Sequence, residues 1–186
     1  ILFNYIYDNV IITLQEVYDQ VGKDPLRYFM VSTKSETSMD FDLNKVIEKN
    51  KDNPVFYCQY AYARASSVIN KAGDLGINIK SFNNFSKITH YLTEDEIEII
   101  LKLLSYPYIV KLASIAREPH RLTIFIEDVS ASFHSFWNKG KDNESLRFID
   151  EKDVIKTQAK LLWLQSMRIV FENIFNIIGI DYHETM

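Results

Sequence analysis

The sequence predicts an all-α fold, in which a bundle of about five helices follows a short helical connector. Two features of the composition favour this fold class. Glycine and proline are sparse, at five and four of 186 residues, so the chain is poor in the turns that a β sandwich requires. Hydrophobic residues make up 47% of the chain, which is enough for a buried core. The third observation is local: several long segments begin at a helix-capping side chain and continue with helical periodicity.

Residues 1–53 are expected to form short elements ahead of the bundle. The β-branched run at residues 10–14 predicts a strand or an extended segment. Thr13 is placed to cap a helix that ends at Gly22, because a residue of the capping-box type stands three positions later. Asp24, which is followed by proline, is placed to cap the next helix.

A short helix is expected at residues 43–50, and the polar residues after it mark the main boundary. The bundle is predicted for residues 54–186, with helices at 54–72, 94–106, 108–117, 119–139 and 151–178. Thr93 and Glu96 form the pattern of a capping box at the start of the second of these helices. Gly140 and Gly179 are placed to end the last two helices.

Charge and composition limit the classes of function. The formal net charge is −4, so attraction to RNA or to an anionic membrane requires a local basic patch. Cys58 is the only cysteine, so a disulfide within the chain and a thiolate zinc site are not expected. The four histidines lack the spacing of metal ligands, and no metal is expected.

The N-terminal segment is apolar but has neither the basic flank of a signal peptide nor the length of a membrane span. No membrane partner is therefore expected, and a cytoplasmic location is the default expectation. The chain does not begin with methionine, which suggests a piece of a longer protein.

One predicted helix has an unusual surface. The segment NPVFYCQYAYAR at residues 53–64 is aromatic and basic, and on a helix Tyr57, Tyr60, Ala61 and Arg64 share one stripe. Flat rings, a guanidinium and a small residue that permits close approach are what single-stranded RNA needs. Aromatic stripes at helical spacing also line protein cores, and tyrosine is stable half-buried. The residues alone therefore leave an RNA surface and a core surface both open.

Several motifs in order along the chain resemble the arginyl-tRNA synthetase family. The segment NPVFYCQYAYAR is similar to the signature that opens the C-terminal anticodon-binding domain of that family. The other matches are EVYDQVGKDPLRYFM at 16–30, DFDL at 40–43, EPHRL at 118–122, FHSFWN at 133–138 and the terminal Met186. The resemblance is co-linear and covers about residues 10–186.

This resemblance implies the C-terminal part of a class I synthetase that ligates arginine to tRNA(Arg) with ATP during protein synthesis. Residues 1–53 would be the end of the catalytic region with a helical connector, and residues 54–186 the DALR-type bundle that holds the anticodon loop. The residues implied to line the anticodon site are Tyr57, Tyr60, Ala61, Arg64, Phe133 and Met186. The expected partner is tRNA(Arg), and the expected state is a monomer.

The chain departs from the family at the chemistry. Class I synthetases hold ATP with a His-Ile-Gly-His-like motif and a Lys-Met-Ser-Lys-like loop, and neither occurs in this sequence. The second should lie just before residue 9, where the sequence reads ILFNYIYD and contains no lysine. The chain is therefore expected to have no catalytic residues and no cofactor of its own, while ATP would bind in the parent enzyme.

Two other interpretations remain open. The chain could be a helical protein-interaction module derived from a synthetase, or the related domain of another class I synthetase such as the cysteinyl enzyme. The Gln59-Tyr60-Ala61 core and the terminal Met186 favour arginine. Phe133 and its aromatic neighbours are also expected to be mostly core. Scattered basic residues, among them Lys141, Lys160 and Arg168, could contact the RNA backbone or form an ordinary solvated surface.

Overall fold

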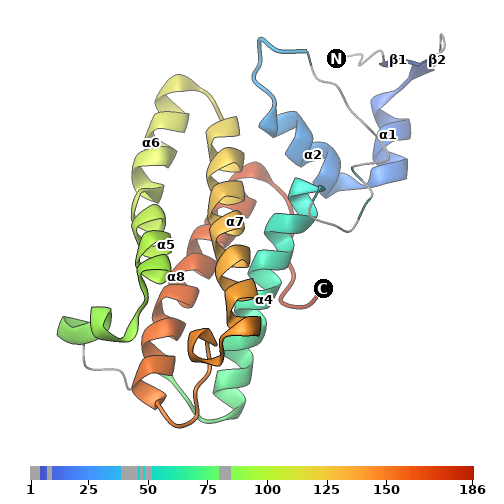
Figure 1. The fold of residues 1–186 in the computed structure, drawn as a ribbon. Helices are drawn as coiled ribbons and strands as arrows, with labels where there is room; N and C mark the ends of the chain where they lie inside the picture. Colours follow the sequence, from blue (N-terminus) through green and yellow to red (C-terminus); the bar gives the residue numbers. More distant parts are fainter. Residues whose placement is uncertain (1–4, 8–9, 39–45, 47, 49–51, 80–84) are drawn as a thin grey trace.

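The computed structural model describes residues 5–7, 10–38, 46, 48, 52–79 and 85–186. A bundle of five α-helices, α4 to α8, forms most of the molecule (Figure 1). Helix α7 lies in the middle of the bundle, in contact with α4, α5, α6 and α8. Helices α1 and α2 lie at the upper end of α4, and the C-terminal tail runs beside α4 (Figure 1). The prediction of an all-α bundle of about five helices is confirmed.

The first elements that the structure describes are a small antiparallel pair of strands, β1 (Tyr5–Tyr7) and β2 (Val10–Ile12), in which Tyr5 is opposite Ile12. Helix α1 (Leu14–Val21) follows. Thr13 caps it, because its hydroxyl accepts a hydrogen bond from the backbone of Glu16 while the Glu16 carboxylate accepts one from the backbone of Thr13. The predicted strand and the predicted cap are both confirmed.

Helix α2 (Lys23–Ser32) begins before the predicted cap. Its N-cap is Gly22, so Asp24 lies inside the first turn and the prediction that Asp24 caps the helix is wrong. The Asp24 carboxylate instead accepts hydrogen bonds from the Asp181 backbone at 3.0 Å and from the Gln59 side chain at 3.1 Å. A partner distant in the sequence has replaced the local one.

Helix α2 packs on the bundle. Tyr28 is fully buried in the main core, and its hydroxyl donates a hydrogen bond of 2.7 Å to Glu127 of α7. Burial raises the pKa of the Glu127 carboxyl, and the bond from Tyr28 opposes that rise. The helix predicted at 43–50 and the motif at 40–43 lie largely outside the described residues, and the division at residue 53 stays a prediction.

Helix α4 (Pro54–Asp74) begins where the sequence predicts. The side chain of Asn53 accepts hydrogen bonds from the backbone of Val55 at 3.2 Å and of Phe56 at 3.4 Å. Proline is tolerated at the first position of a helix because its missing N–H would have no partner there. A 3₁₀ helix, η2 (Phe85–Tyr91), lies in the connection that follows α4.

Helices α5 (Glu94–Leu104) and α6 (Tyr106–Ala116) follow the predicted capping box at Thr93. By length and composition alone, the stretch Glu94–Ala116 could cross a membrane, with a mean hydropathy of 1.5. In the structure Ser105 separates the two helices. Only 17% of the most apolar window is buried, and Leu104 is 70% exposed. The expectation of no membrane partner stays a prediction.

Helix α7 (His120–Asp142) continues past Gly140, so the predicted end at this glycine is wrong. A glycine ends a helix by adopting positive φ, which Gly140 does not do. The chain turns at Asn143 into the 3₁₀ helix η3 (Glu144–Leu146). Helix α8 (Val154–Ile178) then runs to Gly179, which has φ 74° and ends the helix as predicted.

Candidate nucleic-acid interface

Helix α4 presents five polar or aromatic side chains along one line. Tyr57, Tyr60 and Arg64 are half-buried, and Ser67 and Lys71 are exposed. Their spacing of three and four residues keeps them on one face of a helix with 3.6 residues per turn. The opposite face of α4 carries small and apolar residues that pack on α7 and α8. The helix therefore has a packed side and a partly open side.

The guanidinium of Arg64 lies between two aromatic rings. Its Cζ atom is 4.1 Å from the centroid of the Tyr60 ring and 4.9 Å from that of Trp137 on α7. Nη2 donates a hydrogen bond of 3.0 Å to the Tyr60 hydroxyl. Among the residues that the structure describes, no carboxylate forms an ion pair with Arg64. The positive charge is therefore held in place by rings and neutral groups, and it remains uncompensated.

His134 of α7 fixes the other side of Arg64. Its Nε2 is 3.1 Å from the backbone carbonyl of Tyr57, and its Nδ1 is 3.0 Å from Arg64 Nη1. A carbonyl can only accept and a guanidinium can only donate, so Nε2 carries the proton and Nδ1 accepts. A second proton on the ring would set two donors against each other.

The environment of His134 keeps it neutral. Burial, with a smaller contribution from the positive charge of Arg64, lowers its pKa to about 4, and the hydrogen bond to the Tyr57 backbone opposes this shift. The Tyr57 ring covers the imidazole with a centroid distance of 4.3 Å. Tyr57 therefore holds His134 by both its ring and its backbone.

The C-terminal tail crosses α4 and ends beside this cluster. Gln59 donates a hydrogen bond of 2.8 Å to the backbone carbonyl of Asp181. Further along, Glu184 pairs with Arg168 at 2.8 Å and accepts a hydrogen bond from Asn70 at 3.3 Å. These contacts bring Met186, the last residue, to the open side of α4.

A pocket of about 300 Å³ lies between the tail and α4. Its lining residues include Tyr60, Arg64 and Ser67 of α4, Trp137 of α7 and Met186 of the tail. Met186 is 55% exposed, so its flexible thioether is available to a ligand. Glu184 also lines the pocket, but its carboxylate pairs with Arg168. A flat aromatic group that carries negative charge nearby fits this combination of rings, an apolar side chain and a guanidinium without a carboxylate partner among the described residues.

Comparison with known proteins gives the family. Residues 58–186, about two thirds of the chain, match the DALR anticodon binding domain. The chain belongs to this family. The match begins in the first turns of α4 and reaches Met186, so every residue of the pocket lies within the DALR domain.

Two curated relatives are arginine–tRNA ligases. The chain is 40% identical to the ligase of Methylobacterium nodulans over 181 residues, and this match covers 94% of this chain and 30% of the relative. It is 42% identical to the ligase of Bartonella quintana over 173 residues, and this match covers 91% of this chain and 29% of the relative. The chain thus spans about 30% of the length of these relatives. The resemblance to the arginyl-tRNA synthetase family is confirmed.

Solved structures share the fold. The arginyl-tRNA synthetase of Thermus thermophilus superposes with a TM-score of 0.75 at 22% identity, over 95% of this chain and 32% of its own. A protein of Campylobacter jejuni described as an arginyl-tRNA synthetase gives the same TM-score at 24% identity, over 98% and 37%. At this identity the likeness shows the fold alone.

The DALR domain buries two of the predicted site residues. Ala61 and Phe133 are both 0% exposed, so neither reaches the open side of α4, and their prediction as lining residues is corrected. Ala61 falls on the packed side of the helix. Phe133 joins an aromatic cluster in which its ring lies 5.9 Å from that of Phe148. The expectation that Phe133 is a core residue describes it better.

Two residues of the cluster were not predicted as site residues. On α7, His134 directly follows the buried Phe133, and Trp137 directly follows the buried Phe136. The segment FHSFWN contains all four, but helical spacing alone does not say which of them face α4. A polar residue between two aromatic ones was the available signal, because a histidine inside an apolar helix face requires a partner.

Two of the scattered basic residues are engaged inside the molecule. Lys160 is fully buried and pairs with Glu96 at 3.4 Å, so the interpretation of Lys160 as a backbone contact is wrong. Arg168 holds Glu184 and donates a hydrogen bond of 3.2 Å to the Tyr62 hydroxyl. Lys141, by contrast, is exposed at the end of α7.

No grouping of three or more His, Cys, Asp or Glu side chains that could hold a metal occurs within the described residues. Cys58 is fully buried, and burial raises its pKa to about 12, so the thiol is protonated at neutral pH. The expected absence of a cofactor stays a prediction.

Proposed function

We propose that this DALR domain binds the anticodon loop of tRNA(Arg) as the C-terminal part of an arginine–tRNA ligase. The observation that carries the proposal is the Arg64 guanidinium, which lies between Tyr60 and Trp137 without a carboxylate partner among the described residues, beside a pocket that Met186 lines. The family of the domain and the names of its curated relatives support the same partner.

Each side chain has a role in this proposal. Tyr60 and Trp137 offer ring faces on which a loop base can stack, and Arg64 offers donors for a phosphate or a base edge. Met186 would cover the base from the side of the tail. Tyr57 and His134 act as positioning residues, because their contacts set the orientation of Arg64.

The chemistry of arginylation would belong to the rest of the longer protein. ATP would bind there, and this chain would contribute affinity and selection of the tRNA without a catalytic residue, a cofactor or a metal. We propose that it acts as a monomer in the cytoplasm.

The experiment is a binding titration with isolated anticodon stem-loops. Those of tRNA(Arg) and tRNA(Cys) are compared on the 186-residue chain, because the cysteinyl domain is the nearest alternative. Tyr60→Ala is expected to weaken binding of the arginine hairpin by about 1–3 kcal/mol, because a ring face for base stacking is lost. Tyr57→Ala is expected to weaken it indirectly, because His134 loses the ring that holds it beside Arg64. Tyr108→Ala is the matched control, since Tyr108 is a 62% exposed tyrosine on α6.

Thermal melting of the same variants separates binding from folding. The proposal is contradicted if Tyr60→Ala binds RNA normally and only melts earlier, or if the two hairpins bind equally. The isolated chain is also expected to show no arginine-dependent exchange between ATP and pyrophosphate. Exchange above background would place an active site within it.

A further inference from the structure

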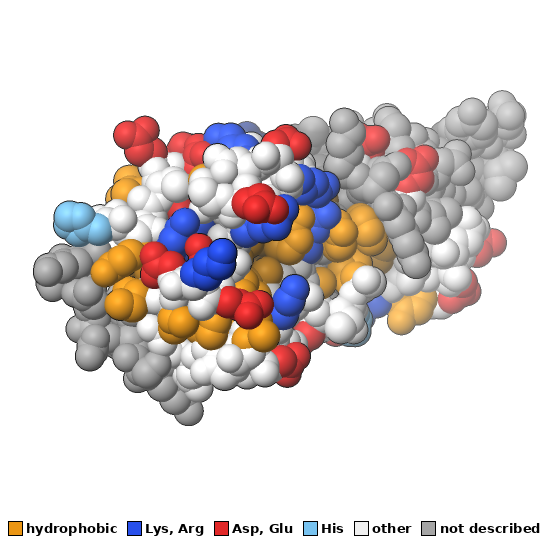
Figure 2. All heavy atoms as spheres, turned by 60° about the horizontal axis from the view of Figure 1, so that its bottom comes forward, with side chains coloured by type: hydrophobic (Ala, Val, Ile, Leu, Met, Phe, Trp, Pro, Cys, Tyr) orange, Lys and Arg blue, Asp and Glu red, His pale blue; other side chains and the backbone are white. Residues whose placement is uncertain are grey.

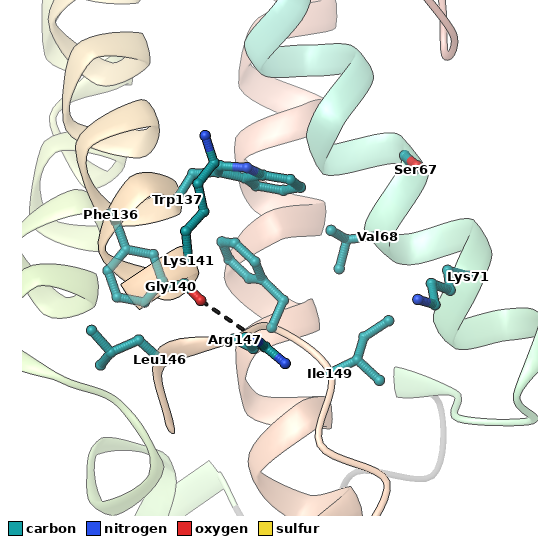
Figure 3. Close-up of a pocket in the computed structure, with 11 residues that line it drawn as sticks. Ser67, Val68, Lys71, Phe136, Trp137, Gly140, Lys141, Leu146, Arg147 and Ile149 are labelled. Carbon is teal, nitrogen blue, oxygen red and sulfur yellow. Dashed lines mark hydrogen bonds between the residues drawn. The ribbon is translucent and has the colours of Figure 1, made fainter. Parts of the chain in front are cut away.

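A second and larger pocket lies beside the first, along the last turns of α4. Its volume is about 580 Å³, within the range typical of small-molecule sites. Side chains from α4, the end of α7 and the loop through η3 surround it (Figure 3). Ser67 and Trp137 line both pockets, so the two form adjacent parts of one surface.

The inner wall of the second pocket is aromatic. Phe148 is buried, and its ring packs against Phe136 with a centroid distance of 5.4 Å and against Trp137 at 5.6 Å. Trp137 itself is half-buried. A ring held from behind by other rings gives a rigid surface for a flat ligand.

The rim of the second pocket is basic. Lys71, Lys141 and Arg147 line it, and no acidic residue does. Lys71 and Lys141 form no ion pair with any residue that the structure describes. Arg147 pairs with Glu144 at 2.8 Å, but both side chains are largely exposed, so this pair is weak and can exchange for another anion.

This rim differs from the rest of the surface around it. Figure 2 shows the lower end of the bundle with Lys and Arg side chains interspersed with Asp and Glu around exposed hydrophobic ones. Asp74 and Asp142 are the acidic residues nearest in sequence to the two lysines, and neither lines the pocket. In a chain of net charge −4, three cations around an aromatic pocket are a local concentration of charge.

We propose that the second pocket binds a further nucleotide of the same RNA strand. Its base would lie against Trp137 and Phe148, and its phosphate would lie between Lys71, Lys141 and Arg147. An RNA strand is the occupant that the surface favours, because it supplies flat rings and anions in alternation and continues across the shared Trp137. This inference rests on the proposed function of the first pocket.

The test combines charge variants with an abasic scan. The probe is the anticodon stem-loop of tRNA(Arg) with an abasic residue at each loop position in turn. The double variant Lys71→Ala/Lys141→Ala is expected to bind the intact hairpin about tenfold more weakly, with a salt slope lower by about 0.7 for each lost phosphate contact. Lys34→Ala/Lys111→Ala removes the same charge from exposed sites elsewhere and is expected to bind normally.

The scan assigns the pocket. At one loop position, removal of the base is expected to cost less affinity in the double lysine variant than in the parent chain. The reason is that the contacts of a base and of its own phosphate depend on each other. Arg64→Ala is expected to show this coupling at a different position. If the lysine variant matches its control while Arg64→Ala binds weakly, the second pocket is not a nucleotide site and the proposed function stands.

Other outcomes are equally informative. Equal loss at every abasic position would mean general electrostatic attraction, which would overturn the second pocket. If neither Arg64→Ala nor the lysine variant alters binding, both proposals fail. Tighter binding of an acidic peptide or an anionic vesicle than of the hairpin would also overturn the nucleotide assignment.

Discussion

Arg64 and Lys160 are two cations that lie over aromatic rings, but they differ in burial and in their charged partners. Arg64 lies over Tyr60 and Trp137, and Lys160 lies 5.2 Å and 5.9 Å from the rings of Phe136 and Phe148. Lys160 is fully buried and forms an ion pair with Glu96. Arg64 is half-buried, and its polar partners among the described residues are an imidazole and a phenol.

The difference is in how the charge is satisfied. The Glu96 carboxylate accepts hydrogen bonds from Thr93 and Trp163, and Lys160 also donates to the backbone carbonyl of Leu146 at 3.0 Å. Burial lowers the pKa of Lys160, and the charge of Glu96 opposes that shift. Every polar group of this pair has a partner inside the fold, so nothing is left for a ligand. The Arg64 guanidinium is held in a fixed position but has no carboxylate partner among the described residues. A positioned cation of this kind can form charge-assisted hydrogen bonds with an anion.

The largest expected effect is on stability at Lys160. Lys160→Met leaves the Glu96 carboxylate buried without its cation, and the free energy of unfolding is expected to fall by about 3–5 kcal/mol. Urea unfolding measures it. Lys139→Met, which breaks an exposed pair with Asp95, is the control and is expected to cost less than about 1 kcal/mol.

The double variant Glu96→Gln/Lys160→Met sharpens this test. It is expected to recover part of the loss, because no buried charge remains unpaired. Equal destabilisation by the Lys160 and Lys139 variants would mean that burial does not distinguish the two pairs.

The next effect is on binding at Arg64. Arg64→Ala is expected to weaken binding of the arginine anticodon stem-loop by about 1.5–3 kcal/mol, since a hydrogen-bonding charge is lost. Arg64→Lys is expected to bind almost as weakly as Arg64→Ala, because lysine lacks the planar guanidinium that can donate two parallel hydrogen bonds. The same variants are unfolded in urea. Normal RNA binding with a large loss of stability would show that Arg64 is a structural cation like Lys160.

The third effect depends on pH. The pKa of His134 is about 4 in the folded chain and 6.5 in its unperturbed state, so the unfolded chain takes up the proton first. Stability from this group is complete above about pH 6.5 and is lost as pH falls toward 4. A loss of about 1–3 kcal/mol is expected over this window.

His134→Gln provides the control for this pH dependence. The variant does not titrate at position 134, so its unfolding free energy should vary less between pH 6.5 and 4 than that of the parent chain. Glu127 titrates in both chains and cancels in the comparison. Parallel curves for the two chains would refute the role assigned to His134.

The smallest effect separates two hydroxyl groups. Tyr60→Phe removes the acceptor for Arg64 Nη2 and is expected to weaken RNA binding by about 0.5–1.5 kcal/mol. Tyr57→Phe is expected to bind almost normally, because the Tyr57 hydroxyl has no hydrogen-bond partner among the described residues. Isothermal titration of both variants checks this order, and a larger loss at Tyr57 would reverse the roles given to the two rings.

The fold was predictable wherever a local interaction decides it. Thr13 and Thr93 bond to backbone three residues away, and Gly179 ends its helix through its own backbone conformation. These interactions lie within one turn, so the sequence pattern contains both partners. Asp24 and Gly140 match the same patterns and were misread. Asp24 bonds to Asp181 and Gln59, far away in the chain, and Gly140 keeps helical backbone.

The candidate site was predictable only in part, for the same reason. Helical periodicity placed Tyr57, Tyr60 and Arg64 on one stripe, and the motif that contains them indicated the family. Periodicity could not say that Ala61 faces the core, because that depends on where α7 and α8 lie.

The sequence by itself therefore determined the bundle helices, the caps at Thr13, Thr93 and Gly179, the family and the basic aromatic stripe of α4. Only the tertiary structure decided that Lys160 is buried with a carboxylate, whereas Arg64 has no carboxylate partner among the described residues. It also brought His134 and Trp137 from α7, and Met186 from the tail, to Arg64. Backbone hydrogen bonds within a helix span about four residues, whereas burial and ion pairing depend on the packing of segments that are far apart along the chain.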